Sequence, residues 1–296
     1  MKLTNVLFGV VFLAASVSAS AQSNLLNAKT PDEIGKKTAA QLISDNDKPL
    51  VYGYVHDRDV LMGKTTWEII DLYERINFPL YFPIDSANIG KDRRSLYDVL
   101  AKAMKDSTLT EVYTDSYFNT KKTLKDISGS LTRVDTTDLG REQINAGIPV
   151  DEQYIVTYNI AAIDVSAYKI KGFWYFDKRQ SEMKYRLLGI CPMTPDVFTM
   201  DKEEKDYIEL FWVYFPSARD ILHEAKAFND KNSAMPITFD HLLNSRRFNG
   251  VIYKEENVYG DREIAEYLKE NAQMQLLESE RVKDKIRNFE QDMWNY

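Results

Sequence analysis

The apolar positions between residues 59 and 77 recur at the spacing of a helix. We expect a helix that Asp59 caps and that runs to about Asn77. Its apolar residues form two neighbouring stripes, so much of its circumference is apolar, and the helix should be buried or pressed against another surface. The stripes consist of Trp67, Ile70, Tyr73 and Ile76, and of Ile69, Leu72 and Ile76.

A second helix is predicted to begin at Ser95. Ser95 and Asp98 form a start similar to a capping box, with Asp in place of the usual Glu. The residues that follow place one apolar stripe on this helix, which predicts that it docks on a sheet. The stripe consists of Leu96, Val99, Leu100, Ala103 and Met104.

The segment between these helices, residues 77–83, is aromatic and contains two prolines. Proline removes a backbone donor and biases the residue before it to extended geometry, so the segment predicts an extended aromatic strip. Two interpretations stay open. Phe78, Tyr81 and Phe82 either attach the segment to the core or form an interface with another protein.

From residue 154 the pattern changes to β-branched and aromatic runs with short polar connections, which predicts antiparallel strands. The runs are 154–160, 168–176, 185–190 and 208–215. Shorter strands are expected at 49–55, 110–113 and 250–253, and helices at the start of 123–140, after Pro216 and at 238–248. Pro192 is expected to end a strand.

A long charged helix is predicted from Asp261 to about Trp294. Its apolar residues keep no heptad repeat, so we expect its first half to pack and its tail to be partly exposed. A solvated helix and capture of a partner by Phe289, Met293 and Trp294 both stay open. These elements together predict an α+β fold, with a mainly antiparallel sheet from the second half of the chain, flanking helices and a long C-terminal helix.

The N-terminus predicts export from the cytoplasm. Lys2, an apolar run at 6–17 and the sequence Ala19-Ser20-Ala21 are typical of a cleaved secretory signal. The run is too short to span a membrane, and no Cys at the cleavage site is available for a lipid anchor. We expect a signal at 1–21, an exposed N-terminal arm at 22–48, an α+β core at 49–260 and a C-terminal helical segment at 261–296.

Composition and motifs argue against nucleic-acid binding and catalysis. The chain is 44% hydrophobic, enough for a core, and its net charge of -7 lacks the basic excess of a nucleic-acid binder. His223-Glu224 is followed by Ala227 where a zinc-protease motif needs a second His. Cys191 is expected to be buried and inert. No catalytic, cofactor or metal residues are predicted, and no direct membrane span.

Two charged clusters are candidate contacts with other proteins. The first, at 57–59, either complements the dipole of the expected helix or forms an ion-pairing patch. The second, at 91–94, either binds an anion, pairs with acidic residues of another subunit or is a solvated loop. With the aromatic residues above, the candidate protein-interface residues are Asp57, Arg58, Asp59, Phe78, Tyr81, Phe82, Arg93 and Arg94.

The run Phe173-Trp174-Tyr175-Phe176 allows two interpretations. On a strand, alternate side chains point to opposite faces, so both faces of the sheet would be covered. Alternatively, Trp174 or Tyr175 is a stacking surface of a periplasmic peptidoglycan- or glycan-binding module.

Several ordered strings in the chain resemble the gliding-motility GldN/PorN family of Bacteroidetes, which belongs to the type IX secretion system. The longest are residues 67–83 (WEIIDLYERINFPLYFP) and 88–100 (NIGKDRRSLYDVL), and further strings are residues 111–118, 170–177 and 186–190. The resemblance implies a structural, non-enzymatic subunit that self-associates in a periplasmic ring. It also implies a GldK/PorK-like outer-membrane lipoprotein partner and contact with the periplasmic part of a GldM/PorM-like protein. The expected location is the periplasm, at the inner side of the outer membrane.

Overall fold

The computed structural model of the chain describes residues 30, 48–85, 93–200, 202, 205–229, 237–269 and 271–294. Nearly all of them belong to one compact unit, made of residues 49–228 and 237–296. The predicted signal at 1–21 and nearly all of the N-terminal arm lie outside the described residues.

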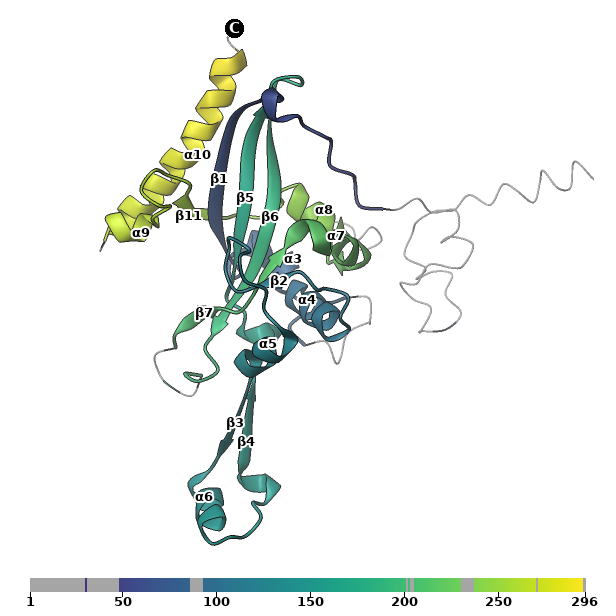
Figure 1. Cartoon of the computed structure of the whole chain (residues 1–296), viewed down its shortest axis with the longest axis vertical. Coiled ribbons are helices and arrows are strands. Elements are labelled where there is room, and N and C mark those ends of the chain that lie inside the picture. Colours follow the sequence, from purple (N-terminus) through teal and green to yellow (C-terminus); the bar gives the residue numbers. More distant parts are fainter. Residues whose placement is uncertain are drawn as a thin grey trace, which may run out of the picture. The chain divides into compact units, whose positions relative to one another are not determined.

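The centre of the unit is an antiparallel sheet with seven strands among the described residues (Figure 1). Five of its strands follow residue 154, and all the described pairs in it are antiparallel, which confirms the predicted α+β fold. Its order is β11 (Val251–Glu255), β1 (Val60–Asp71), β5 (Ala167–Asp177), β6 (Glu182–Pro195), β8 (Trp212–Tyr214) and β2 (Val112–Tyr113), with β7 (Tyr207–Glu209) also on β6.

Helices cover this sheet from different sides. The main core contains buried residues of α4 (Leu96–Lys105), α7 (Phe215–Glu224) and α8 (Phe239–Asn244). A separate apolar cluster joins α10 (Ala272–Trp294) to the sheet through Ile252, Val282 and Ile286, and Figure 1 shows α10 and α9 (Ile264–Tyr267) beside β11. A small sheet of β9 (Lys226–Ala227) and β10 (Ile237–Thr238) adjoins α8.

A second two-stranded sheet forms what we call the hairpin module, residues 124–159. It pairs β3 (Thr132–Thr136) with β4 (Ile155–Asn159), and neither strand joins the main sheet. The module also contains α5 (Leu124–Leu131), α6 (Asp138–Asn145) and the short turn η5 (Glu152–Tyr154), and Figure 1 shows α6 at one end of the paired strands. Thr123 caps α5 by accepting from the backbone N–H of Asp126.

The prediction of a helix from Asp59 to Asn77 is wrong, because residues 60–71 form β1. β1 is paired on both sides, with β11 and with β5, and the middle of the strand is covered on both faces. In the middle of the strand the side chains therefore do not alternate between buried and exposed, and the apolar residues fall at a helix-like spacing by coincidence. Tyr73 and Ile76, which complete the supposed stripe, are both exposed.

β1 contributes Glu68 to an ion pair with Arg246 that is largely buried. Glu68 is 1% exposed, and its two carboxylate oxygens accept from Arg246 at 3.1 and 2.7 Å. The guanidinium also lies over the rings of Trp174, Tyr185 and Phe248, at 4.9, 4.2 and 5.1 Å from their centroids. Burial alone would lower the pKa of Arg246, but the carboxylate of Glu68 and, to a smaller extent, the hydroxyl of Tyr185 together raise that pKa. This pair fixes the loop after α8 against the sheet.

The prediction of an extended strip at 77–83 is also wrong. The segment contains the turn η4 (Arg75–Asn77) and the short helix α3 (Phe78–Tyr81). Pro79 lies in the first turn of α3, where backbone N–H groups have no partner within the helix, so proline is tolerated there. Only Phe82 and the residues after it leave the helix.

The predicted C-terminal helix is interrupted. α9 ends at Tyr267 and α10 begins at Ala272, so Asp261 does not start the long helix. Asn271 supplies the cap, because its side chain accepts from the backbone N–H of Met274 at 3.0 Å. The first half of the predicted segment packs through Ile264 of α9, and its tail exposes Trp294, as expected. The start of α10, however, exposes Leu276 and Leu277, and its buried residues are Ser279, Val282 and Ile286.

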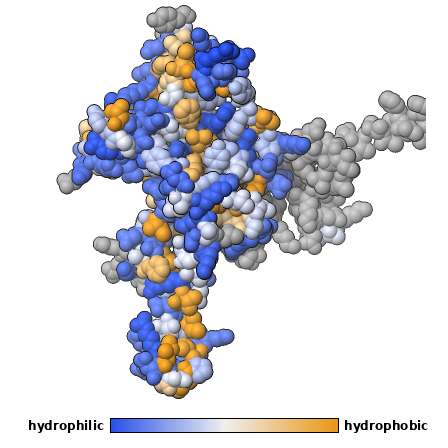
Figure 2. Space-filling model, in the orientation of Figure 1, coloured by the Kyte–Doolittle hydropathy of each residue, from blue (hydrophilic) through white to orange (hydrophobic). Residues whose placement is uncertain are grey.

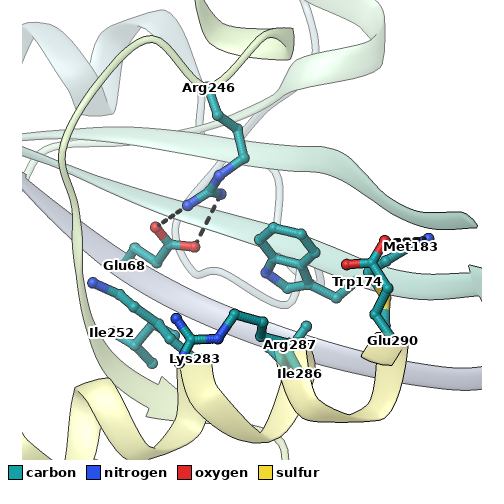
Figure 3. A pocket seen from close by; sticks show the side chains of 9 residues that line it. All are labelled: Glu68, Trp174, Met183, Arg246, Ile252, Lys283, Ile286, Arg287 and Glu290. Carbon is teal, nitrogen blue, oxygen red and sulfur yellow. Dashed lines mark hydrogen bonds and ion pairs between the residues drawn. The ribbon is translucent and has the colours of Figure 1, made fainter. Parts of the chain in front are cut away.

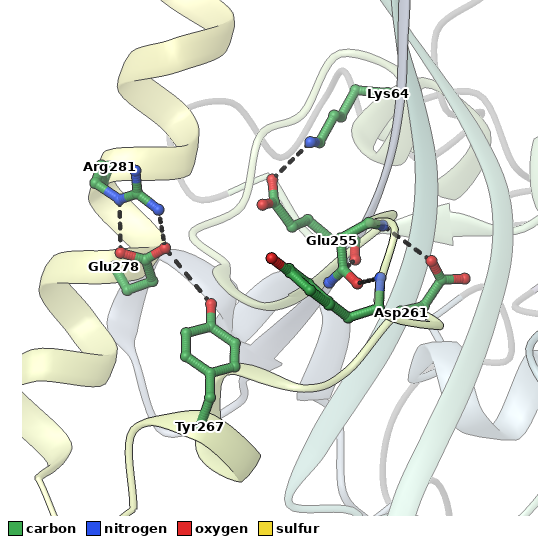
Figure 4. A network of polar contacts seen from close by, with 8 residues as sticks. Lys64, Glu255, Asp261, Tyr267, Glu278 and Arg281 are labelled. Carbon is green, nitrogen blue, oxygen red and sulfur yellow. Dashed lines mark hydrogen bonds and ion pairs between the residues drawn. The ribbon is translucent and has the colours of Figure 1, made fainter.

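Polar contacts join α9, α10 and the end of β11, as Figure 4 shows. Tyr267 donates to Glu278 at 3.5 Å, and Arg281 donates to the same carboxylate at 2.6 Å. Lys64 of β1 pairs with Glu255 at 2.9 Å, and the side chain of Asp261 accepts from the backbone N–H of Asn257 at 3.0 Å. The loop between β11 and α9 is thereby held in place.

Several shorter predictions are confirmed and others are not. The cap of α4 by Ser95, the helix after Thr238 and the edge strand β11 are present. Residues 49–55 form no strand, the segment 123–140 contains β3 as well as helices, and β6 continues through Pro192 to Pro195. The helix expected after Pro216 is α7, which begins at Phe215 with Pro216 in its first turn.

Replacing Glu68 by Gln is expected to lower the free energy of unfolding by about 3 kcal/mol, because Arg246 then lacks its counter-charge in a buried site. Urea denaturation followed by circular dichroism measures the change. Asp138→Asn is the control: that carboxylate is 99% exposed and pairs with Arg141 at 3.8 Å, so its loss should cost less than about 0.5 kcal/mol. Equal effects of the two variants would contradict this role of Glu68.

Buried tyrosines make the fold sensitive to alkali. Burial raises the pKa values of Tyr97, Tyr168 and Tyr185 above the ordinary tyrosine value of 10.0. The folded state therefore keeps protons that the unfolded state loses above about pH 10, so stability is full below that pH and falls as pH rises through it. Each such tyrosine contributes a slope of about 1.4 kcal/mol per pH unit.

Tyr168→Phe should therefore reduce the steepness of the alkaline loss of stability by about 1.4 kcal/mol per pH unit. Urea denaturation at intervals between pH 8 and pH 11.5 tests this. Between pH 8 and pH 9 the variant and the parent chain should show parallel pH dependence. An unchanged slope above pH 10 would mean that Tyr168 ionises in the folded state.

Candidate functional site

An exposed group of aromatic side chains follows the end of β1. We call Tyr73, Phe78, Tyr81 and Phe82 the aromatic patch. Their rings touch in sequence: Tyr73 to Tyr81 at 6.4 Å, Tyr81 to Phe82 at 4.9 Å and Phe78 to Phe82 at 5.3 Å between centroids, all edge to face. Tyr73, Phe78 and Phe82 are 67, 38 and 41% exposed, whereas Tyr81 is 8% exposed.

The backbone beneath the aromatic patch is fixed by Asn77, which is fully buried. Its side-chain amide donates to the carbonyls of Asp71 and Asn249, at 2.7 and 3.1 Å, and its oxygen accepts from the N–H of Asn249 at 2.9 Å. Tyr81 donates its hydroxyl to the carbonyl of Ile163 at 3.2 Å. The patch is therefore a preorganised surface, since its rings are held before any partner arrives.

Tyr81 differs from Phe78 and Phe82 in its role, because it attaches the segment to the core and they remain accessible to a partner. Burial, with smaller effects of Tyr73 and Asp164, raises the pKa of Tyr81, so its hydroxyl stays a donor at neutral pH. Tyr81 attaches α3 to the turn η6 (Ala162–Asp164), while Phe78 and Phe82 remain accessible. One of the three predicted aromatic contacts thus belongs largely to the core and two to the surface.

The predicted cluster at 57–59 lies elsewhere. Asp57, Arg58 and Asp59 form the turn η3 (Asp57–Asp59) directly before β1, and Arg58 pairs with Asp59 at 3.9 Å. The 12 residues of β1 separate this turn from the aromatic patch by about 40 Å of extended chain. Since no helix follows Asp59, the carboxylates have no helix dipole to complement, and an exposed ion-pairing patch is the interpretation that remains.

Arg93 and Arg94 lie beside a hollow between α4 and α7. Arg93 is exposed, with its guanidinium 4.9 Å from the ring centroid of Phe228, and Lys91 lies outside the described residues. Arg94 lines a hollow of about 650 Å³ in which four carboxylates face three cations. Burial raises the pKa of one of these carboxylates, Asp98. The charge balance favours ion pairing with mixed partners over anion binding.

Exposed apolar side chains on the hairpin module were not expected from the sequence. Six aliphatic side chains there are each more than a third exposed, and Figure 2 shows apolar residues gathered along this part of the molecule. A two-stranded sheet with one covered face normally turns such residues inward. Val134 is the one apolar residue of the run 132–136, so the sequence contains no clear signal of this exposure. The six are Val134, Leu139, Ile144, Ile148, Ile155 and Val156.

Other candidates have a structural role in the described part of the chain. Phe289 packs on Phe176 with centroids 5.8 Å apart, whereas Trp294 is exposed. Cys191 is fully buried between Trp67 and Trp212, and burial raises the pKa of its thiol. Along the described ranges no group of three or more His, Cys, Asp or Glu residues is arranged for a metal ion, and no helix there is long and apolar enough to cross a membrane.

Serine at Phe78 or Phe82 is expected to lower the free energy of unfolding by only about 1–2 kcal/mol, because each ring keeps part of its surface in water. Leu80→Ala, in the same short helix, should cost about 2–5 kcal/mol since Leu80 is fully buried. Thermal and urea denaturation of the three variants make the comparison. A large loss with Phe78→Ser or Phe82→Ser would show that the aromatic patch serves the core.

Comparison with known proteins agrees with the resemblance found in the sequence. The model of a family described as gliding motility associated protein GldN matches residues 55–295. No curated protein matches the chain. The match includes β1, the aromatic patch, the hairpin module and α10 up to its end. The chain therefore belongs to the gliding motility associated GldN family, which takes part in gliding motility and type IX protein secretion.

Proposed function

We propose that the chain is a non-enzymatic structural subunit of the type IX secretion and gliding machinery. In this proposal it self-associates in a periplasmic ring with a GldK/PorK-like outer-membrane lipoprotein, and it meets the periplasmic part of a GldM/PorM-like protein. Family membership supports a structural role in the machinery. The ring, its partners and the periplasmic location are our extension of that membership, and the signal-like residues 1–21 support the location.

The observation that carries the proposal is the set of exposed apolar side chains on the hairpin module. A single chain gains nothing from six aliphatic side chains in water, because burying such a side chain is worth about 1.5–3 kcal/mol. Large exposed apolar patches on a folded chain commonly mark protein contacts. The aromatic patch adds a second such surface, with rings of the type that dominate binding energy at interfaces.

The charged candidates have a different role in this proposal. Arg58 and Arg93 are exposed, so they contribute orientation and association rate more than affinity. Because exposed charges are screened by salt, their contribution should weaken as ionic strength rises.

The alternative function, glycan binding through Trp174 or Tyr175, has less support in the geometry. Tyr175 is 7% exposed, and its ring stacks on Phe173 at 6.0 Å. Trp174 contacts Tyr185 at 4.9 Å and lies beneath the guanidinium of Arg246. A sugar-stacking platform needs an open aromatic face, and neither ring offers one.

Co-expression with the candidate lipoprotein, followed by native mass spectrometry and negative-stain microscopy, tests the proposed assembly. We expect closed particles with the parent chain and their loss with Val134→Thr/Ile155→Thr, because these two residues share one face of the hairpin and hydroxyl groups would be buried in an apolar contact. Phe78→Ser/Phe82→Ser should weaken assembly at least tenfold, since hot-spot aromatic residues typically contribute 2 kcal/mol or more.

Val258→Thr is the matched control, because Val258 is 92% exposed and lies outside both surfaces. It should assemble as the parent chain does. Particles of normal yield from both surface variants would rule out these surfaces as contacts. A parent chain that stays monomeric with the lipoprotein would count against the ring itself.

A further inference from the structure

A groove between α10 and the sheet has the features of a ligand site. It encloses about 290 Å³ and is lined by residues of β1, β5, β6, β11, α10 and the loop after α8 (Figure 3). That volume is at the lower end of the range for small-molecule pockets. Its floor is apolar, since Ile252 and Ile286 are 2 and 6% exposed, and Met183 adds a flexible wall.

A hydrogen-bond donor in the groove lacks a partner. The indole N–H of Trp174 is buried and has no acceptor among the described residues. Figure 3 shows this nitrogen on the side of the ring that points toward the space between Glu68 and Arg287. An indole N–H donates and never accepts, so whatever occupies this space should present an acceptor.

The charges around the groove favour a negatively charged acceptor. Three cations and two carboxylates line it. Glu68 is already held by two bonds from Arg246, and Glu290 accepts from the backbone N–H of Met183 at 3.4 Å. Lys283 and Arg287 stand at the entrance, and their present partners Glu280 and Asp284 are about half exposed. Such surface pairs are weak, so both cations can turn to a ligand at little cost.

We propose that this groove binds a small apolar carboxylate of the size of an acylated amino acid. The carboxylate accepts from the indole N–H of Trp174 and lies near Lys283 and Arg287, and the apolar part contacts Met183, Ile252 and Ile286. This site uses the edge of Trp174 and not its face, so it differs from a sugar-stacking platform. It does not depend on the proposed assembly, because none of its residues belongs to the hairpin module or the aromatic patch.

The test follows the indole N–H resonances of the 15N-labelled mature chain, residues 22–296, while a ligand is added. Trp174→Phe assigns the Trp174 signal by removing it. N-acetyl-leucine should shift this signal, and N-acetyl-leucinamide, which lacks only the charge, should bind at least tenfold more weakly. Lys283→Gln/Arg287→Gln should weaken binding of N-acetyl-leucine about tenfold or more, with the fold intact by circular dichroism.

Lys285→Gln is the matched control, because it removes one exposed positive charge from the same helix outside the groove. It should leave binding within twofold of the parent chain. The proposal is overturned if N-acetyl-leucine leaves the Trp174 signal in place, which would mean that water alone satisfies the donor. It is also overturned if the amide binds equally well, or if Lys285→Gln weakens binding as much as the variants at the groove.

Discussion

The complete burial of the middle of β1 is the constraint on which the rest of the structure depends. Thr66, Trp67 and Glu68 are consecutive and nearly inaccessible to water, so both faces of the strand and both of its edges must be covered. β11 and β5 occupy the edges, and the covering of one face includes α10 and the loop after α8. A carboxylate at such a position is tolerated only with a cation beside it, which Arg246 supplies from a segment 178 residues away. The last third of the chain is thus required for the first strand to be buried.

The same constraint explains why the sequence predicted some elements and not others. β5 and β6 were expected because long β-branched and aromatic runs with short connections are unambiguous, and α4 because Ser95 marks its start. β1 was mistaken for a helix because a strand covered on both faces shows no alternation, and its partners β5 and β11 lie far along the chain. Local patterns contain no information about coverage by distant segments. The break before α10 was locally encoded by Asn271, but a cap is easily overlooked inside a charged run.

The sequence predicted which aromatic residues belong to the candidate site, but not how they are arranged. The aromatic residues at 78–82 were expected to meet a partner or the core, and the structure divides them, with Tyr81 inside and Phe78 and Phe82 outside. That division follows from α3, whose turn places Phe78 and Phe82 on one face because they are four residues apart. In an extended strip every second side chain points to the same side, so Phe78 and Phe82 would share a side with Leu80. Leu80 is instead fully buried, which only the helical turn permits.

The length of β1 also has a consequence for the proposed assembly. The charged turn η3 precedes the strand and the aromatic patch follows it, so two surfaces of different chemistry are held about 40 Å apart by one rigid element. A chain that uses two different surfaces makes heterologous contacts, and such contacts propagate until a rotation closes them into a ring. Rigidity between the surfaces is required for closure, since small angular errors add up around a ring of many subunits. β1 is paired with β5 along its whole length, and in its second half also with β11, where it is buried on both faces. This supplies that rigidity and connects the cost of burying Glu68 to the role proposed for the chain.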